Sequence, residues 1–288
     1  QGGIGCGPYR VVDFEAGIRA RFERHDGWHR ADEGAWFDAI EMTVLNDPNA
    51  RQTAIVTGEV DAITDVDLKT ADRLDGAPGV ILDDVPSGTH ITMPMFCDTP
   101  PFDDVNVRLA LKHAINRQEI VDKILFGRGT VGNDHPIAPT MPYFADLPQR
   151  EQDLDRARYH LQQAGHDRLS VDISVNDTLL SGAVNMCSLF AEQARPAGLD
   201  INVVREPADG YWSSVWLKKP FCVVSWAARP TPDVMFSLAY RAGAEWNESR
   251  WRNERFNELL VAAKSETDEA LRAEMYAEMQ SLCRDDGG

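Results

Sequence analysis

The sequence predicts an α/β fold with two lobes, and three observations lead to this prediction. At 288 residues the chain exceeds one average domain, so one large or two medium domains are expected. The first third reads as short strands with one helix, whereas segments with helical periodicity dominate after Phe102. Between residues 153 and 226, helical and strand patterns alternate, which is typical of a parallel sheet. We therefore expect a first unit over residues 1–90 and a second over residues 91–288.

The first unit is predicted to contain mostly strands. Apolar and polar residues alternate in several short segments, which indicates half-buried strands. We expect these strands over residues 9–14, 19–24, 39–45, 60–62 and 80–82. One helix separates the third strand from the fourth: Asp47 can cap it, Pro48 suits its first turn, and Gly58 ends it.

The helices of the second unit begin at residues that favour helix N-termini. Asp103 or Asp104 can cap the first, and Asn116 with Glu119 forms a capping-box-like pair for the next. Asp153 begins a third helix. The alternating part then follows, with strands expected over residues 169–175, 200–205 and 221–226 in one sheet. One helix is expected through Met186 and Phe190 to Gly198, and another around residues 211–217.

The composition argues against several classes of protein. A formal net charge of −17 disfavours nucleic acid and anionic membrane surfaces as partners, and solubility alone accounts for such acidity. The 5 cysteines are scattered without CxxC spacing, so neither a disulfide scaffold nor a zinc ribbon is expected. His25 and His29 have a spacing that could suit a metal, but Asp26-Gly27 interrupts any helix between them, and we expect a surface loop. No nucleotide-binding or nucleophile motif is found, so we expect no enzyme and neither metal nor cofactor.

Four motifs follow one another along the chain in an order typical of one protein family. They are GCGPY at 5–9, GEVD at 58–61, PPFDDVNVR at 100–108 and AINR at 114–117. In this order they resemble family 5 of the extracytoplasmic solute-binding proteins, the receptors of peptide, nickel and opine ABC importers. The resemblance covers nearly the whole chain. It implies a two-lobed architecture like that of class II periplasmic binding proteins.

The resemblance also implies a function and a location. Full members of this family begin with a signal peptide and part of a first lobe, and end with a strand that returns to that lobe. This sequence resembles a fragment that lacks the N-terminal part and the C-terminal return strand. A periplasmic or otherwise extracytoplasmic receptor is expected, which captures a peptide, an opine or a related anionic small molecule between its lobes and delivers it to an inner-membrane ABC permease. An enzyme or a stand-alone sensor with the same fold is the alternative.

Arg229 is the main candidate for ligand binding. Residues 221–226 are apolar on both alternations, so Arg229 is expected just beyond the carboxyl end of a buried strand, where open α/β sheets bind ligands. In peptide-binding relatives the stretch resembles Trp-x-Ala-Asp-Tyr, whose aspartate binds the ligand's amino terminus. Aligned on Trp226, this chain has Arg229 in place of the acid, which implies an anionic ligand group. The alternative is that Arg229 pairs with Asp233 and holds the proline-rich turn.

Further candidates lie around Arg229. Large aromatic faces with a few polar anchors are typical of small-molecule pockets, although each aromatic residue alone is more often part of a core. We expect such walls from Trp226, Tyr211, Trp212 and Trp246, and an adaptable amide from Asn247. Thr89 and His90, which precede the helix after Phe102, are expected to face the same cleft.

Overall fold

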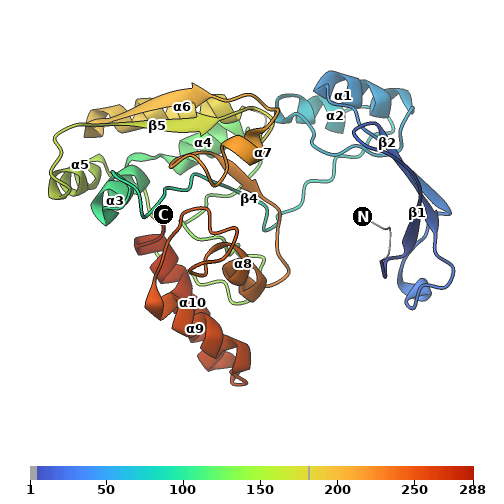
Figure 1. Ribbon diagram of the computed structural model, residues 1–288. Coiled ribbons are helices and arrows are strands. Elements are labelled where there is room, and N and C mark those ends of the chain that lie inside the picture. The colour runs from blue at the N-terminus through green and yellow to red at the C-terminus, as the bar shows by residue number, and fades with distance from the viewer. Residues whose placement is uncertain (1–4, 181) are drawn as a thin grey trace. The chain divides into compact units, whose positions relative to one another are not determined.

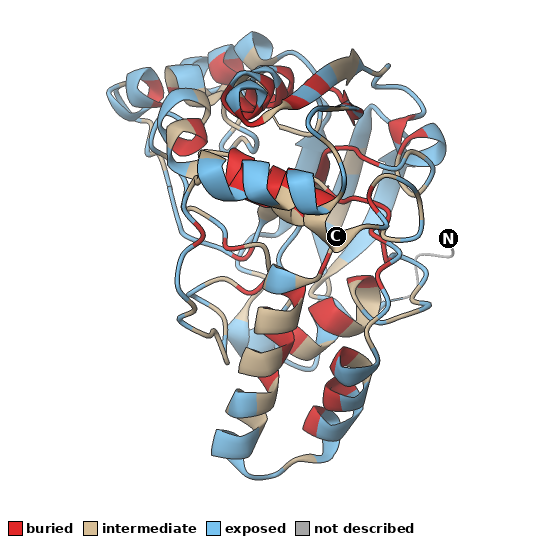
Figure 2. Cartoon of the chain, turned by 90° about the vertical axis from the view of Figure 1, so that its left-hand side faces the viewer, coloured by how far each residue is buried: buried red, intermediate tan, exposed pale blue. Residues whose placement is uncertain are grey.

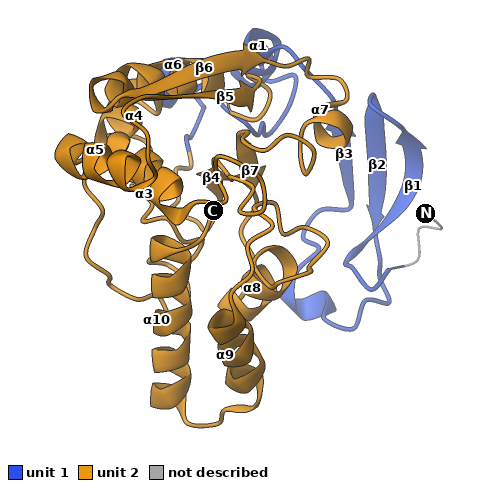
Figure 3. Ribbon diagram, turned by 60° about the vertical axis from the view of Figure 1, so that its left-hand side comes forward, with its two compact units in different colours: residues 1–82 blue, residues 83–288 orange. Residues whose placement is uncertain are grey.

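The computed structural model describes residues 5–180 and 182–288. It divides into two compact units, Gln1–Leu82 and Asp83–Gly288, which Figure 3 shows in different colours. The sequence predicted the boundary after residue 90, whereas the structure has it after Leu82. The difference arises because the strand that begins at His90 pairs with a strand of the second unit.

Unit 1 is built on a three-stranded antiparallel sheet (Figure 1). Its strands in spatial order are β1 (Tyr9–Glu15), β2 (Arg19–Arg24) and β3 (Ala39–Thr43), close to the predicted ranges. Helix α1 (Pro48–Thr57) follows, and the short α2 (Ala71–Asp75) completes the regular elements of this unit apart from two short 3₁₀ turns.

The ends of α1 agree with the prediction, whereas two strands of unit 1 do not form. The Asp47 carboxylate accepts a hydrogen bond from the backbone N–H of Ala50 at 2.8 Å, and Gly58 takes the left-handed conformation with φ 74°. The strands predicted over 60–62 and 80–82 are wrong, because the backbone there is irregular. Each is only three residues long, and no strand in the described residues pairs with either of them.

The first three helices of unit 2 begin where their capping residues predict. They are α3 (Val105–Ala114), α4 (Arg117–Ile124) and α5 (Leu154–Gln163). Their caps are Asp104, Asn116 and Asp153, and each side chain accepts a hydrogen bond from a backbone N–H of the first turn. The capping prediction is confirmed for all three helices, with Asp104 rather than Asp103 at the first.

The expected sheet of unit 2 is formed only in part. Strands β5 (Leu169–Val175) and β6 (Leu199–Arg205) are parallel, and α6 (Ala183–Ala194) connects them. The third predicted strand, over residues 221–226, has two different partners. Cys222 makes one parallel bridge to Ser174 of β5. The rest of the segment forms β7 (Val224–Trp226), which pairs antiparallel with β4 (His90–Thr92). The sequence did not predict β4, with which the end of the third strand pairs instead of with β5.

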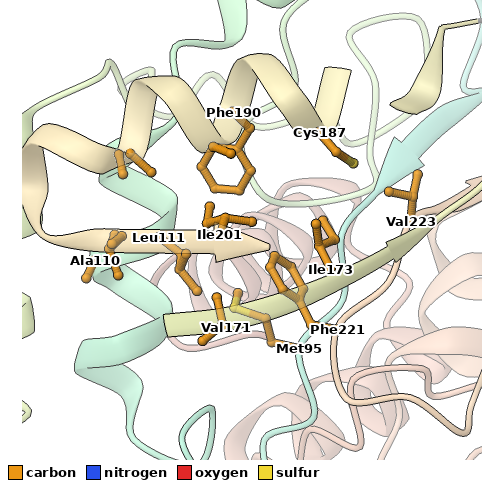
Figure 4. Packing of buried hydrophobic residues seen from close by; sticks show 14 of the residues in the cluster. Met95, Ala110, Leu111, Val171, Ile173, Cys187, Phe190, Ile201, Phe221 and Val223 are labelled. Carbon is orange, nitrogen blue, oxygen red and sulfur yellow. The ribbon is translucent and has the colours of Figure 1, made fainter. Parts of the chain in front are cut away.

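The main core of unit 2 lies between this parallel pair and its helices. Figure 4 shows Phe190 of α6 beside Ile173 of β5 and Ile201 of β6, with Leu111 of α3 in the same cluster. Buried positions alternate with exposed ones along the helices of this unit (Figure 2), as amphipathic helices require. This core holds β5, and through the Ser174 bridge it also holds the segment that leads into β7.

The last third of unit 2 is helical and packs around a second, aromatic core. The short α7 (Tyr211–Ser214) lies outside this core, because its Tyr211 packs in a third cluster with Trp226 of β7. The helices around the aromatic core are α8 (Pro232–Ala239), α9 (Glu254–Ser265) and α10 (Glu269–Asp285). Buried Phe236, Trp251, Phe256 and Tyr276 belong to this core. No helix among the described residues combines the length and the apolar character that crossing a membrane requires.

Candidate ligand-binding site

Arg229 lies three residues beyond the end of β7 and is partly exposed. Its Nη1 donates hydrogen bonds to the carbonyl oxygens of Ala227 and Ala228, at 2.9 and 3.3 Å. The guanidinium carbon lies 5.6 Å from the ring centroid of Trp226. Within residues 5–180 and 182–288, no carboxylate pairs with Arg229, and its Nε and Nη2 have no protein acceptor. The Nε–Nη2 edge of the guanidinium is therefore available to a ligand.

The pairing of Arg229 with Asp233, which was the alternative from the sequence, is not formed. The Asp233 carboxylate lies 3.4 Å from Nζ of Lys264 on α9 instead. The proline-rich turn is held by other means, since Thr231 caps α8 by accepting a hydrogen bond from the N–H of Val234 at 3.4 Å. The turn therefore keeps its conformation without an ion pair from Arg229.

His90 is the direct cross-strand neighbour of Trp226 in the β4–β7 pair. Its Nδ1 lies 2.8 Å from the carbonyl oxygen of Gly88, which requires the proton on Nδ1 and leaves Nε2 as an acceptor. Nε2 is buried and has no partner in the described part of the chain. Burial lowers the pKa of His90, and the nearby charge of Arg229 lowers it further. The exposed Thr89 precedes it, with its backbone N–H donating to the Ser87 hydroxyl at 3.1 Å.

Four tryptophans form one cluster beside Arg229, defined here as the indole cluster of Trp212, Trp216, Trp226 and Trp246. The rings of Trp216, Trp226 and Trp246 contact one another, with centroid distances of 5.8, 6.1 and 6.3 Å, and Trp212 stands 5.7 Å from Trp216. Trp226 is buried, whereas Trp212 is 52% and Trp246 37% exposed. The cluster therefore has a buried side on β7 and two indoles that solvent reaches.

The side chain at the back of the cluster is Glu248, which sequence reasoning missed. It is 7% exposed and accepts hydrogen bonds from Nε1 of Trp226 and Nε1 of Trp216, both at 2.9 Å, and from the Thr92 hydroxyl at 2.8 Å. Burial raises the pKa of Glu248, and the three donors offset part of that effect. The only sequence signal was an acid placed among aromatic residues, which is too weak to single it out.

Two of the predicted site residues have structural roles. Tyr211 is fully buried, and the single proton of its hydroxyl lies between the carbonyl oxygens of Ser174 and Val223, whose distances from the hydroxyl oxygen are 3.0 and 2.9 Å. Asn247 is buried as well, and its amide donates to carbonyl oxygens of residues 240, 241 and 251. Neither side chain has an amide or hydroxyl group left free for a ligand in this arrangement.

The predicted residues that the structure brings together are Arg229, Trp226, His90, Trp246 and Trp212. A separate groove of about 320 Å³ lies between α9 and α10, and none of the predicted residues lines it. No group of three or more histidine, cysteine, aspartate or glutamate side chains with the geometry of a metal site occurs in the described ranges.

The comparisons with known proteins point to one family. The profile of the bacterial extracellular solute-binding proteins, family 5 Middle, matches residues 1–248. This chain belongs to the family 5 solute-binding proteins. The resemblance drawn from the four motifs is therefore confirmed.

The relatives within family 5 are distant and longer. The peptide transport periplasmic protein SapA of Salmonella typhimurium is 25% identical over an alignment of 289 positions, which covers 97% of this chain and 52% of that protein. The dipeptide-binding protein of Escherichia coli is 23% identical, over 98% of this chain and 54% of its own length. The chain thus spans about half the length of these curated relatives.

Solved structures of family 5 proteins share the fold. The periplasmic binding protein DppA of Helicobacter pylori, in complex with the peptide STSA, matches with a TM-score of 0.85 and 21% identity, over 98% of this chain and 56% of that one. NikZ of Campylobacter jejuni, in complex with Ni(L-His), matches with a TM-score of 0.84 and 18% identity, over 98% and 59%. The fold is accordingly that of a class II-like periplasmic binding protein, present in part.

Proposed function

We propose that this chain is part of the ligand-binding component of an ABC import system, which captures a small solute outside the cytoplasm and delivers it to a membrane permease. Membership of family 5 supports this proposal, as do relatives that are named as peptide transport and dipeptide-binding proteins. The candidate site contains aromatic faces and hydrogen-bonding groups, which recognise a ligand without breaking its bonds. No residue in this proposal carries out a chemical step.

The ligand that we propose carries a carboxylate or a similar planar anionic group. The single observation that carries this is the Nε–Nη2 edge of Arg229, which has no protein acceptor among the described residues. A guanidinium edge binds a carboxylate through two parallel hydrogen bonds, and its charge is permanent.

The indole cluster supplies the apolar contact in this proposal. Trp246 and Trp212 are the exposed members, and the first packs on the same ring that carries Arg229. Large flat side chains bury ligand surface at a small cost in conformational entropy. The proposed ligand therefore combines an anionic group with an apolar or aromatic part, a description that fits peptides and opines.

A thermal-shift screen on the full-length protein tests this function. The ligands are peptides, opines, sugar acids and nickel chelates, each acid paired with its amide. We expect at least one acid to raise the melting temperature, because a ligand that binds only the folded state stabilises it. Its amide should raise the melting temperature much less. Equal shifts from acid and amide would contradict the anionic ligand, and stabilisation by nickel chelates alone would contradict the proposed class.

A further inference from the structure

The carboxylate of Glu248 is buried with neutral partners only. Its three hydrogen bonds come from a hydroxyl and two indole N–H groups, and no ion pair of Glu248 is found in the described residues. Taking a charge out of water costs several kcal/mol even after the protein relaxes, so a carboxylate with this environment calls for an explanation. Each donor fixes one lone-pair direction of the carboxylate.

The three donors come from three separate segments of unit 2. Thr92 belongs to β4, Trp226 to β7, and Trp216 to the turn after α7. Glu248 itself lies in the loop between α8 and α9. The carboxylate therefore fixes the orientation of two indole rings relative to the strand pair that precedes Arg229.

Trp226 links this carboxylate to Arg229. Its N–H donates to Oε1 of Glu248, and its ring lies 5.6 Å from the guanidinium carbon. A cation is attracted to an indole face, and a negative acceptor on the indole N–H increases the electron density of that face. The ring orientation thus decides where the guanidinium rests, because the other contacts of Arg229 are carbonyls of its own exposed turn.

We propose that Glu248 is a positioning residue of the ligand site, which fixes the Trp226 ring and through it the place of the Arg229 guanidinium. This inference rests on the proposed function, because the Arg229 guanidinium is the group that binds the ligand anion in that proposal. Glu248 itself is buried and does not touch the ligand. The Trp226 indole connects the two charged groups: its N–H donates to the Glu248 carboxylate, and its ring face lies beside the Arg229 guanidinium.

Substitution by glutamine separates this role from simple packing. Glu248→Gln keeps the volume, but the new NH₂ group would face an N–H or O–H donor where the carboxylate accepted one. At least one of the three hydrogen bonds is then lost. Trp226→Phe removes the N–H and keeps an aromatic ring, so it breaks the same link from the other side.

The test uses the fluorescence of the exposed indoles and needs no ligand. In the 288-residue chain carrying Trp28→Phe and Trp36→Phe, the remaining tryptophans are the indole cluster and the buried Trp251. Iodide, which is anionic, and acrylamide, which is neutral, are used as quenchers, and the ratio of their quenching constants reports positive charge near the exposed indoles. We expect Arg229→Ala to lower this ratio about twofold, the effect of one unit charge several ångströms away in water.

Glu248→Gln should lower the ratio by a similar factor, although Arg229 is still present. This direction is informative, because losing a negative charge by itself raises the attraction for iodide. Glu206→Gln is the matched control: Glu206 is also a largely buried carboxylate of unit 2, but it bonds to Ser174 and Lys219 and to no indole of the cluster. The ratio in that variant should stay the same or rise.

The proposal fails if Glu248→Gln leaves the iodide ratio unchanged or raises it while the near-ultraviolet circular dichroism still shows a folded chain. If Glu248→Gln does not fold, Trp226→Phe decides in the same way. A failed ligand screen would instead contradict the proposed function and leave the quenching result standing, so the two failures can be told apart.

Discussion

At the scale of single residues, the contacts of Arg229 separate the two interpretations that its sequence position allowed. The interpretation in which Arg229 holds the proline-rich turn requires an ion pair with Asp233, but Asp233 pairs with Lys264 instead. The guanidinium uses only Nη1 on the backbone and keeps its other edge open. Its substitution should therefore change ligand affinity more than stability, because a partly solvated side chain contributes little to folding.

Two histidines of unit 2 make a prediction about pH. Burial, with a smaller contribution from the charge of Arg150, lowers the pKa of His113 to about 4, and burial lowers that of His135 to about 4. In the unfolded chain each titrates near pH 6.5, so the unfolded state binds more protons between about pH 6.5 and 4. Stability is therefore complete above this window and falls as the pH decreases through it.

The measurement is urea unfolding at several pH values. We expect the free energy of unfolding to decrease by about 1 to 3 kcal/mol per buried histidine between pH 7 and 4.5. His113→Gln should flatten this dependence, whereas the same change at His166, which lies after α5, should not. An equally steep dependence in His113→Gln would show that other groups cause the loss.

At the scale of elements, the helix ends were predictable and the short strands were not. A cap is a local interaction, so Asp47, Asp104, Asn116 and Asp153 carry their signal in the sequence itself. Strand β4 is three residues long, and it exists because β7 pairs with it. Such pairing depends on residues more than a hundred positions away, which no local pattern encodes.

The difference between local and long-range interactions also explains which site candidates the sequence could indicate and which it could not. Arg229 could be singled out as a candidate from the sequence because it follows an apolar strand directly. Glu248 was missed because its partners come from β4, β7 and the turn after α7, and only the folded chain brings them together. Tyr211 was expected as a wall and Asn247 as a polar anchor of a ligand pocket, but backbone carbonyls nearby in space satisfy their polar atoms.

Helix α10 provides a test of the capping argument. Asp268 accepts hydrogen bonds from the N–H groups of Ala270 and Leu271, at 2.9 and 3.1 Å. We expect Asp268→Ala to lower the free energy of unfolding by about 1 kcal/mol, because both donors lose their acceptor. Asp268→Asn should lower the free energy of unfolding by only a few tenths of a kcal/mol, because asparagine caps equally well. Denaturant unfolding checks both, and equal losses would contradict a capping role.

At the scale of the whole molecule, the chain has two compact units with an irregular segment at their boundary. Residues 80–87 form no helix or strand, and Ile81 is 92% exposed. Exposed segments without backbone pairing are preferred sites of proteolysis. The boundary should therefore be the first place where a protease cuts.

Limited proteolysis with thermolysin, followed by mass spectrometry, checks this. We expect an early product that begins within residues 81–85 and resists further digestion, because the cores of unit 2 lie beyond that segment. First cuts inside α3, β5 or α10 would show that unit 2 is less stable than its packing implies.

We propose above all that this family 5 chain contributes the Arg229 guanidinium, which binds the anionic group of a captured solute. Titration calorimetry on the full-length protein tests it most directly, with the acid that stabilises the protein best in the thermal-shift screen. The account predicts that Arg229→Ala weakens binding by roughly 1.5–3 kcal/mol, that Arg229→Lys restores only part of it, and that the melting temperature without ligand hardly changes. Unchanged affinity in Arg229→Ala would contradict the account.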